Sequence, residues 1–163
     1  MAQEWIDNLA QDIKQKNHEA AEDYGRSQHY AGIVSDLGKG FFLSVVGCLQ
    51  ENVEAMRRRL QGDLTSAETA VQTVKPDEIR ITRTRFPWVD ARLVHNEATI
   101  ALDYAKGPGG EGDPNQDRKT CSFAFQVAPD DSLFVEDAFA ASPRQYKQPE
   151  ELARQITEML FAA

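Results

Sequence analysis

The stretch that decides the fold is IRITRTRFPWVDARLVHNEATIALDY, residues 79–104. Apolar and polar side chains alternate along IRITRTR, then along WVDARLVH, then along ATIALDY. Pro87 interrupts the first alternation, and Asn96 and Glu97 form a plausible tight turn after the second. A period of two is typical of strands that bury one face. Because short turns join neighbouring strands antiparallel, this stretch predicts the start of a β-meander.

Two further strands are expected after a long loop. The loop, residues 105–119, contains four glycines and two prolines. TCSFAFQVA at residues 120–128 and SLFVEDAF at residues 132–139 alternate again, with a PDD turn between them. The sequence therefore predicts a five-stranded antiparallel sheet over residues 79–139.

Helical periodicity precedes the sheet. Apolar residues spaced by four or seven predict a helix over residues 3–24, which Gly25 is well placed to end. A broader apolar face predicts a second helix over residues 28–60, followed by Gly62. The two helices together form an expected helical hairpin within residues 1–62. The thin stripe of the first helix consists of Trp5, Leu9, Ile13, Ala20 and Tyr24.

Three local features qualify this picture. Gly38 and Gly40 weaken the second helix and mark a kink, a break or a close approach by another backbone. TSAETAVQTVKP, residues 65–76, fits either a short helix with a capping box or a connecting loop. A last helix is expected over residues 149–161, because Pro149 suits a first helical position and two glutamates follow it.

The expected fold class is α+β, with one domain over residues 1–163. A five-stranded meander packs in two layers against a long N-terminal helical pair and a C-terminal helix. The alternation separates an apolar sheet face from a polar one. The apolar face collects Ile79, Ile81, Val89, Ala91, Leu93, Ile100, Leu102, Tyr104, Cys121, Phe123, Phe125 and Val127. The polar face collects Arg80, Thr82, Thr84, Asp90, Arg92, Thr99, Asp103, Thr120, Ser122 and Gln126.

Charge and composition narrow the classes of function. The formal net charge of −8 argues against general affinity for nucleic acid or an anionic membrane. The N-terminus lacks the layout of a signal peptide, and the apolar run at residues 41–49 is too short to span a bilayer. Cys48 and Cys121 lack CxxC spacing and are expected to be buried, reduced thiols. We therefore expect a cytoplasmic protein.

Four arginines in residues 79–94 raise the question of a binding surface. Arg80 and Arg92 lie on the polar face with Asp90 and Asp103, and cross-strand ion pairs would make this face an ordinary solvated surface. The alternative is a shallow site for a ligand or a partner. Arg83 and Arg85 fall on the parity of the apolar face unless a bulge intervenes.

Trp88 is the remaining candidate binding residue. It follows Pro87 at the start of a strand, where an exposed aromatic side chain can anchor a partner. The alternative is that Trp88 caps the core.

Signals of catalysis are weak. Asp90 and Asp103 on neighbouring strands could form an acid/base pair if one pKa were raised, although salt bridging with the arginines is the simpler use. The histidines at 18, 29 and 95 show no metal-ligand spacing. No catalytic residue, metal or cofactor is predicted, and an enzyme is not favoured.

The leading interpretation is a non-catalytic binding, adaptor or chaperone-like protein that acts on an unknown protein partner or self-associates as a homodimer. The expected shape is similar to that of small acidic secretion chaperones, α+β dimers that hold a client segment; the likeness is one of fold alone. The alternative is a small-molecule-binding protein or enzyme with a pocket between sheet and helices. The aromatic residues that would line that pocket, or fill a plain core, are Phe41, Phe42, Tyr104, Phe123 and Phe125.

Overall fold

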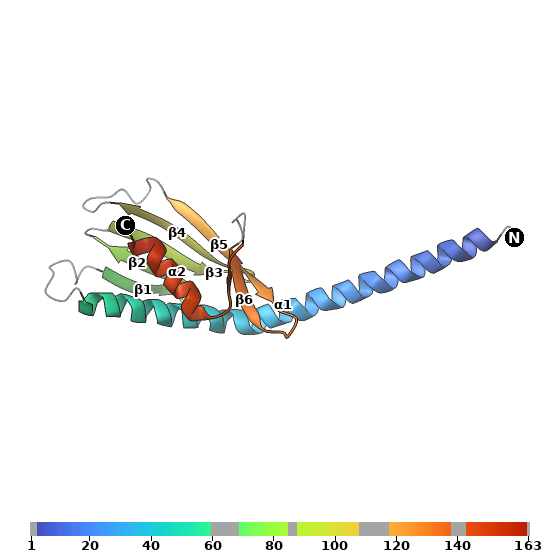
Figure 1. Ribbon diagram of the computed structural model, residues 1–163, viewed down its shortest axis with the longest axis horizontal. Coiled ribbons are helices and arrows are strands. Elements are labelled where there is room, and N and C mark those ends of the chain that lie inside the picture. Colours follow the sequence, from blue (N-terminus) through green and yellow to red (C-terminus); the bar gives the residue numbers. More distant parts are fainter. Residues whose placement is uncertain (1–2, 60–68, 85–87, 108–117, 138–142, 163) are drawn as a thin grey trace.

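A computed structural model describes residues 3–59, 69–84, 88–107, 118–137 and 143–162. A very long helix comes first, followed by seven strands and a short helix (Figure 1). The helices are α1 (Glu4–Arg59) and α2 (Pro149–Phe161). The strands are β1 (Thr69–Lys75), β2 (Glu78–Arg83), β3 (Trp88–His95), β4 (Thr99–Gly107), β5 (Lys119–Val127), β6 (Leu133–Asp137) and β7 (Gln145–Tyr146).

The strands form one antiparallel sheet in the order β1-β2-β3-β4-β5-β6-β7. The predicted α+β class, the meander and the C-terminal helix are confirmed. All five predicted strands are present as β2 to β6, but the sheet has seven strands and not five. The two missed strands, β1 and β7, lie at the two edges of the sheet.

Strand β1 replaces the short helix or loop that was expected between the N-terminal helices and the sheet. TAVQTVK contains two threonines and two valines, and β-branched residues of this kind favour strands. The strand pairs with β2 in a register that places Val71 opposite Ile81. The helical alternative for residues 69–74 is therefore wrong, and the expected capping box at Thr65 and Glu68 lies outside the described residues.

The expected helical hairpin is also wrong, because α1 is one continuous helix of 56 residues. Gly25 does not end a helix but lies inside it. A glycine within a helix costs only about 1 kcal/mol, whereas stopping forfeits the backbone hydrogen bonds of a whole turn. The first proline in the chain is Pro76, so nothing in the sequence forces a break before it.

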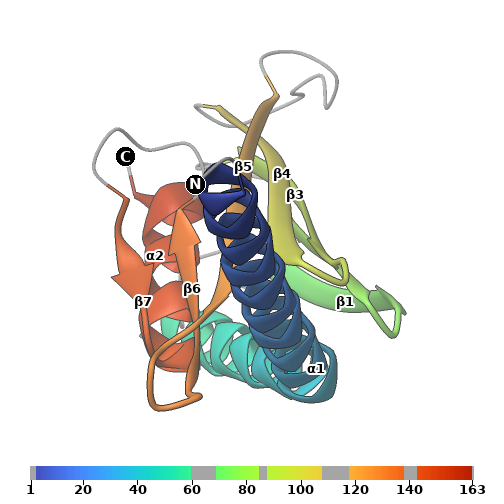
Figure 2. The same ribbon diagram turned by 90° about the vertical axis from the view of Figure 1, so that its right-hand side faces the viewer.

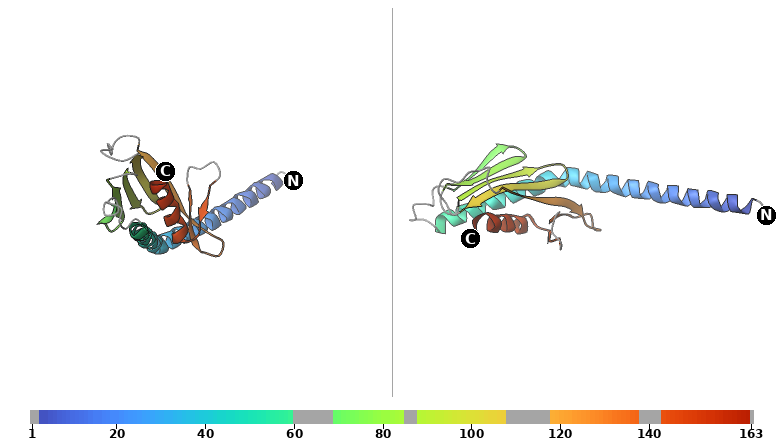
Figure 3. Two further views of the ribbon diagram at one scale, coloured as in Figure 1. Left: turned by 60° about the vertical axis from the view of Figure 1, so that its left-hand side comes forward. Right: turned by 90° about the horizontal axis from the view of Figure 1, so that it is seen from above.

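Both helices cover the same face of the sheet (Figures 1 and 3). Phe42, Val45 and Leu49 of α1 are fully or almost fully buried against the sheet, and Leu152 and Ile156 of α2 are fully buried beside them. The predicted apolar face of the sheet is confirmed: its residues are buried except Cys121 and Val127, which are half-buried. No helix of the described chain covers the opposite, polar face of strands β1 to β5.

Gly38 lies against side chains of the sheet. A Cβ atom added there would lie 3.4 Å from the ring of Phe125 and 3.5 Å from Nε2 of His95. Gly40 is exposed, and an added Cβ would meet nothing within 4 Å. The expected break is wrong, because α1 continues through both glycines. The neighbours of Gly38 are side chains and not the expected backbone.

One stretch of α1 is long and apolar enough to cross a membrane, judged by length and composition, with a mean hydropathy of 1.4. A third of that stretch is buried inside the protein (33%). The core helix of a soluble protein and a signal sequence near an N-terminus both pass the same test. In α1 the buried residues all lie between Gly38 and Val53, where they face the sheet.

Candidate functional sites

The structure brings the four charged residues of the predicted site onto one surface. Arg80 of β2 lies opposite Arg92 of β3, and Arg92 lies opposite Asp103 of β4. Asp90 lies two residues before Arg92 on the same face of β3. Four residues from three adjacent strands thus form a contiguous polar surface, as the alternation predicted.

Arg80 and Arg92 lie directly opposite each other, but each forms an ion pair with a carboxylate one step along the neighbouring strand. Like charges directly opposite in a sheet repel. The Arg80 guanidinium instead donates from Nε and Nη2 to Oδ1 of Asp90, over 3.1 and 3.0 Å. Arg92 donates to Oε1 of Glu78. The expected cross-strand pairing of arginines with carboxylates is confirmed, although the partners are diagonal.

Arg118 joins the two aspartates. Its Nη1 donates to Oδ2 of Asp90 over 2.9 Å, and its Nε donates to Oδ1 of Asp103 over 3.0 Å. Burial by itself would raise the pKa of Asp90, whose side chain is only 11% exposed, but hydrogen bonds from Arg118 and Arg80 outweigh burial and lower that pKa. The lowered pKa of Asp90 and the bridge through Arg118 favour salt bridging over an acid/base pair, which would need Asp90 or Asp103 to have a raised pKa.

The ion-pair cluster, defined as Glu78, Arg80, Asp90, Arg92, Asp103 and Arg118, surrounds a shallow open depression of about 560 Å³. Each of its six side chains forms an ion pair with another member of the cluster. Charges neutralised in this way attract an outside ligand weakly. The geometry favours the solvated, charge-paired surface over a ligand site, and the cluster's evident role is to tie β2, β3 and β4 to the start of β5.

Sequence reasoning missed Arg118, because it was assigned to the glycine-rich loop. A usable signal was present: Arg118, Thr120 and Ser122 continue the alternation of the polar face one step beyond the predicted strand. Arg83 was predicted to lie on the apolar face, and it is indeed buried, where it donates a hydrogen bond to Oγ1 of Thr69 over 2.6 Å. Arg85 lies outside the described residues.

Trp88 is half-buried on β3, on the same parity as Asp90 and Arg92. Its partner across the ladder is Gly107, where an added Cβ would lie 3.9 Å from the indole ring. The ring therefore lies over a position without a side chain, on the polar face. Trp88 is not among the exposed large apolar residues, and its role as an anchor stays a prediction.

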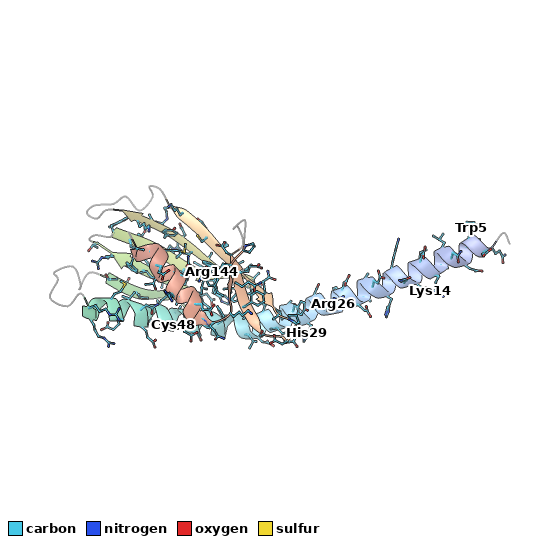
Figure 4. All side chains as sticks on the ribbon, in the orientation of Figure 1. Trp5, Lys14, Arg26, His29, Cys48 and Arg144 are labelled. Carbon is cyan, nitrogen blue, oxygen red and sulfur yellow. The ribbon has the colours of Figure 1, made fainter. Side chains whose placement is uncertain are left out.

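The tryptophan that is exposed is Trp5, near the far end of α1 (Figure 4). We call residues 4–28 of α1 the arm. Every residue of the arm is exposed, and the arm projects away from the rest of the described chain (Figures 1 and 2). At 1.5 Å per residue its length is about 38 Å. His29 marks its base, where Nε2 lies 3.1 Å from Oδ2 of Asp131 in the turn between β5 and β6.

One face of the arm carries exposed apolar side chains. We call this face the stripe; its large members are Trp5 (63% exposed), Ile6 (47%), Leu9 (50%), Ile13 (52%) and Tyr24 (66%). The polar residues Gln11 and Gln15 lie on the opposite side of an ideal helix. Monomeric soluble proteins rarely leave contiguous apolar surface of this kind uncovered.

The stripe continues the face of α1 that packs on the sheet. Thirty-six residues make ten turns of an ideal α-helix, so residues separated by that number point the same way. This spacing relates Ile6 to Phe42, Leu9 to Val45 and Ile13 to Leu49, and in each pair the second residue is buried in the core. The arm therefore has the same core-type face as the rest of α1, but the described chain supplies nothing to cover it.

Other candidate chemistry is absent from the described residues or is part of the core. The five aromatic residues proposed to line a pocket all belong to the core, where the rings of Phe41 and Phe125 meet edge to face with centroids 6.0 Å apart. Of the five, only Phe125 also lines a hollow between α1 and the sheet among the described pockets. Cys48 and Cys121 are half-buried and unpaired, and burial raises the pKa of both thiols. Over the described ranges, no three His, Cys, Asp or Glu side chains are grouped to hold a metal.

Comparisons of the chain with protein-family models, with curated proteins and with solved structures find no match. Interpretation of function therefore rests on the arm and the ion-pair cluster themselves.

Proposed function

We propose that this is a non-catalytic adaptor protein that binds another protein chain through the stripe on its arm. The observation that carries the proposal is the continuation of a core-type helix face over 25 exposed residues. The α+β body then serves as the folded unit that the arm attaches to its partner. A cytoplasmic location is part of the proposal, because unpaired thiols such as Cys48 and Cys121 persist in a reducing compartment.

Helix energetics support a bound state for the arm. Most helical stability in proteins comes from packing of an amphipathic face, and the arm has no such packing within the described chain. Gly25 further weakens it by about 1 kcal/mol. A partner that covers the stripe would supply the missing burial, whereas an unbound arm would fray.

Charge favours a protein over the other surfaces that an amphipathic helix can bind. Residues 4–28 hold three Lys or Arg and six Asp or Glu, a net charge of 3 − 6 = −3. Helices that lie on membranes are usually rich in Lys and Arg on the polar face, which the arm lacks. The same negative charge opposes binding to a phosphate backbone.

The test is a co-purification of the tagged full chain from cells that also express an untagged copy. The stripe variant carries Leu9→Ser and Ile13→Ser, and the control carries Gln11→Ser and Gln15→Ser on the opposite face. We expect at least one protein chain, whether the untagged copy or another protein, to be retained by wild type and control but lost from the stripe variant. Identical sets of retained proteins for all three would overturn the proposal.

A further inference from the structure

We propose that the chain bound by the arm is a second copy of this protein, with the two arms side by side and antiparallel. This inference rests on the proposed function and names its partner. The arrangement is a two-fold dimer in which each stripe covers the other.

The side on which the stripe lies excludes a parallel pair. The stripe points to the same side of α1 as the sheet does, because Ile6, Leu9 and Ile13 repeat the azimuth of the buried residues ten turns later. A parallel partner helix lying on the stripe would run directly into the sheet of the first copy. Its own sheet would occupy the same space from the other side. An antiparallel partner instead leads away from the first body, so the two bodies lie at opposite ends.

The length of the arm suits one antiparallel partner arm. The free helix ends at His29, where Asp131 in the β5–β6 turn contacts it. A second arm of equal length can therefore lie along the whole stripe, with its tip stopping at the base of the first arm. Just beyond the base lies a hollow of about 440 Å³ with a mixed lining, apolar at Val34 and Phe125 and polar at Ser35, His95 and Glu97. The hollow leaves space at this point for the tip of a second arm.

When the arms overlap fully, with Ile6 opposite Tyr24 of the second copy, Leu9 meets the small side chain of Ala20 on the stripe of that copy. On an ideal helix Glu4, Asp7 and Arg26 lie away from the stripe, and each arm has a net charge of −3. Charge therefore does not favour the pairing, and contact between the apolar stripes carries the association.

Size-exclusion chromatography with light scattering tests the association on the purified full-length protein. We expect a mass of about 36 kDa, twice the 18.2 kDa of one chain. Leu9→Ser with Ile13→Ser removes four half-exposed apolar side chains from the dimer and should raise the dissociation constant roughly a thousand-fold. Gln11→Ser with Gln15→Ser should leave it unchanged. The near-ultraviolet dichroism of all three shows that the body remains folded.

Spin labels on the body test the orientation. Gln126 is exposed on β5 and does not lie on α1, so a nitroxide at Gln126→Cys reports the separation of the bodies once Cys48 and Cys121 are replaced by serine. Antiparallel arms hold the labels about an arm length apart, near 38 Å or more. A short distance, or a dimer that survives the stripe variant, would overturn the antiparallel pairing.

If the wild-type protein is monomeric, the proposal that a second copy binds the arm is overturned, but the proposed function is not. In that case the co-purification would still lose a different protein when the stripe is changed. Binding of the monomer to phosphatidylcholine–phosphatidylglycerol vesicles through the stripe would replace both ideas with a membrane surface.

Discussion

Replacing Asp90 by asparagine tests whether the ion-pair cluster stabilises the sheet. The Asp90 side chain is 11% exposed and accepts hydrogen bonds from two guanidinium groups, those of Arg80 and Arg118. Hydrogen bonds to charged groups are worth about 1.5–3 kcal/mol each. Asparagine keeps one acceptor oxygen, and the Arg80 side chain is half exposed, so solvent screening reduces the loss.

We expect Asp90→Asn to lower the free energy of unfolding by about 2 kcal/mol at pH 7. For a chain of this size the midpoint of thermal unfolding should fall by about 4–8 °C. Urea unfolding followed by circular dichroism measures the free energy directly. Asp36→Asn is the matched control, because Asp36 is an exposed aspartate on α1, and its effect should stay within about 0.5 kcal/mol.

The pH dependence gives the prediction a second, independent test. The folded protein lowers the pKa of Asp90, so its stabilising contribution is complete above the unfolded value of about 3.9. The contribution is lost as the pH falls through the lower, folded pKa. The difference between wild type and Asp90→Asn should therefore be largest near neutral pH and shrink below about pH 4. A difference that stays constant down to pH 3, or one below about 0.5 kcal/mol at pH 7, would refute this account of the cluster.

Two further predictions concern α1 and the thiols. Gly38→Leu should destabilise the protein by about 1–3 kcal/mol, because the new side chain meets the side chains of Phe125 and His95. Gly40→Leu places its side chain in open space and should not destabilise the protein. If both variants lowered the midpoint of thermal unfolding equally, the contact between Gly38 and Phe125 would be contradicted. Cys48 and Cys121 should react with iodoacetamide more slowly at pH 7 than a free cysteine, since their raised pKa values keep the thiolate scarce. Labelling as fast as that of a small thiol would contradict the partial burial of Cys48 and Cys121 that raises their pKa values.

The meander was predictable because the alternation that marks each strand can be read within a few neighbouring residues. Each predicted strand alternates with a period of two, and ten of the twelve residues assigned to the apolar face are buried. The helical hairpin was wrong for a related reason. A glycine such as Gly25 resembles a helix end in the sequence, but its cost of about 1 kcal/mol is too small to stop a helix that no proline interrupts.

The ion-pair cluster was predictable only in part. Alternation placed Arg80, Asp90, Arg92 and Asp103 on one face, which the structure confirms. The exact partners depend on the register between strands, and that register sets the diagonal pairs. Arg118 comes from the end of a loop that gave no periodic signal of its own, so its position between two aspartates could not be read locally.

The sequence by itself determined the secondary-structure class, the two faces of the sheet and the negative charge of the arm. These properties follow from side-chain period and composition, which act over a few residues. Only the tertiary structure decided that the first 25 residues of α1 have no cover. Burial of a helix face depends on where the sheet ends in space, and here the sheet covers α1 only from Gly38 to Val53. The same type of face is therefore core between Gly38 and Val53 and exposed over residues 4–28 of the described chain.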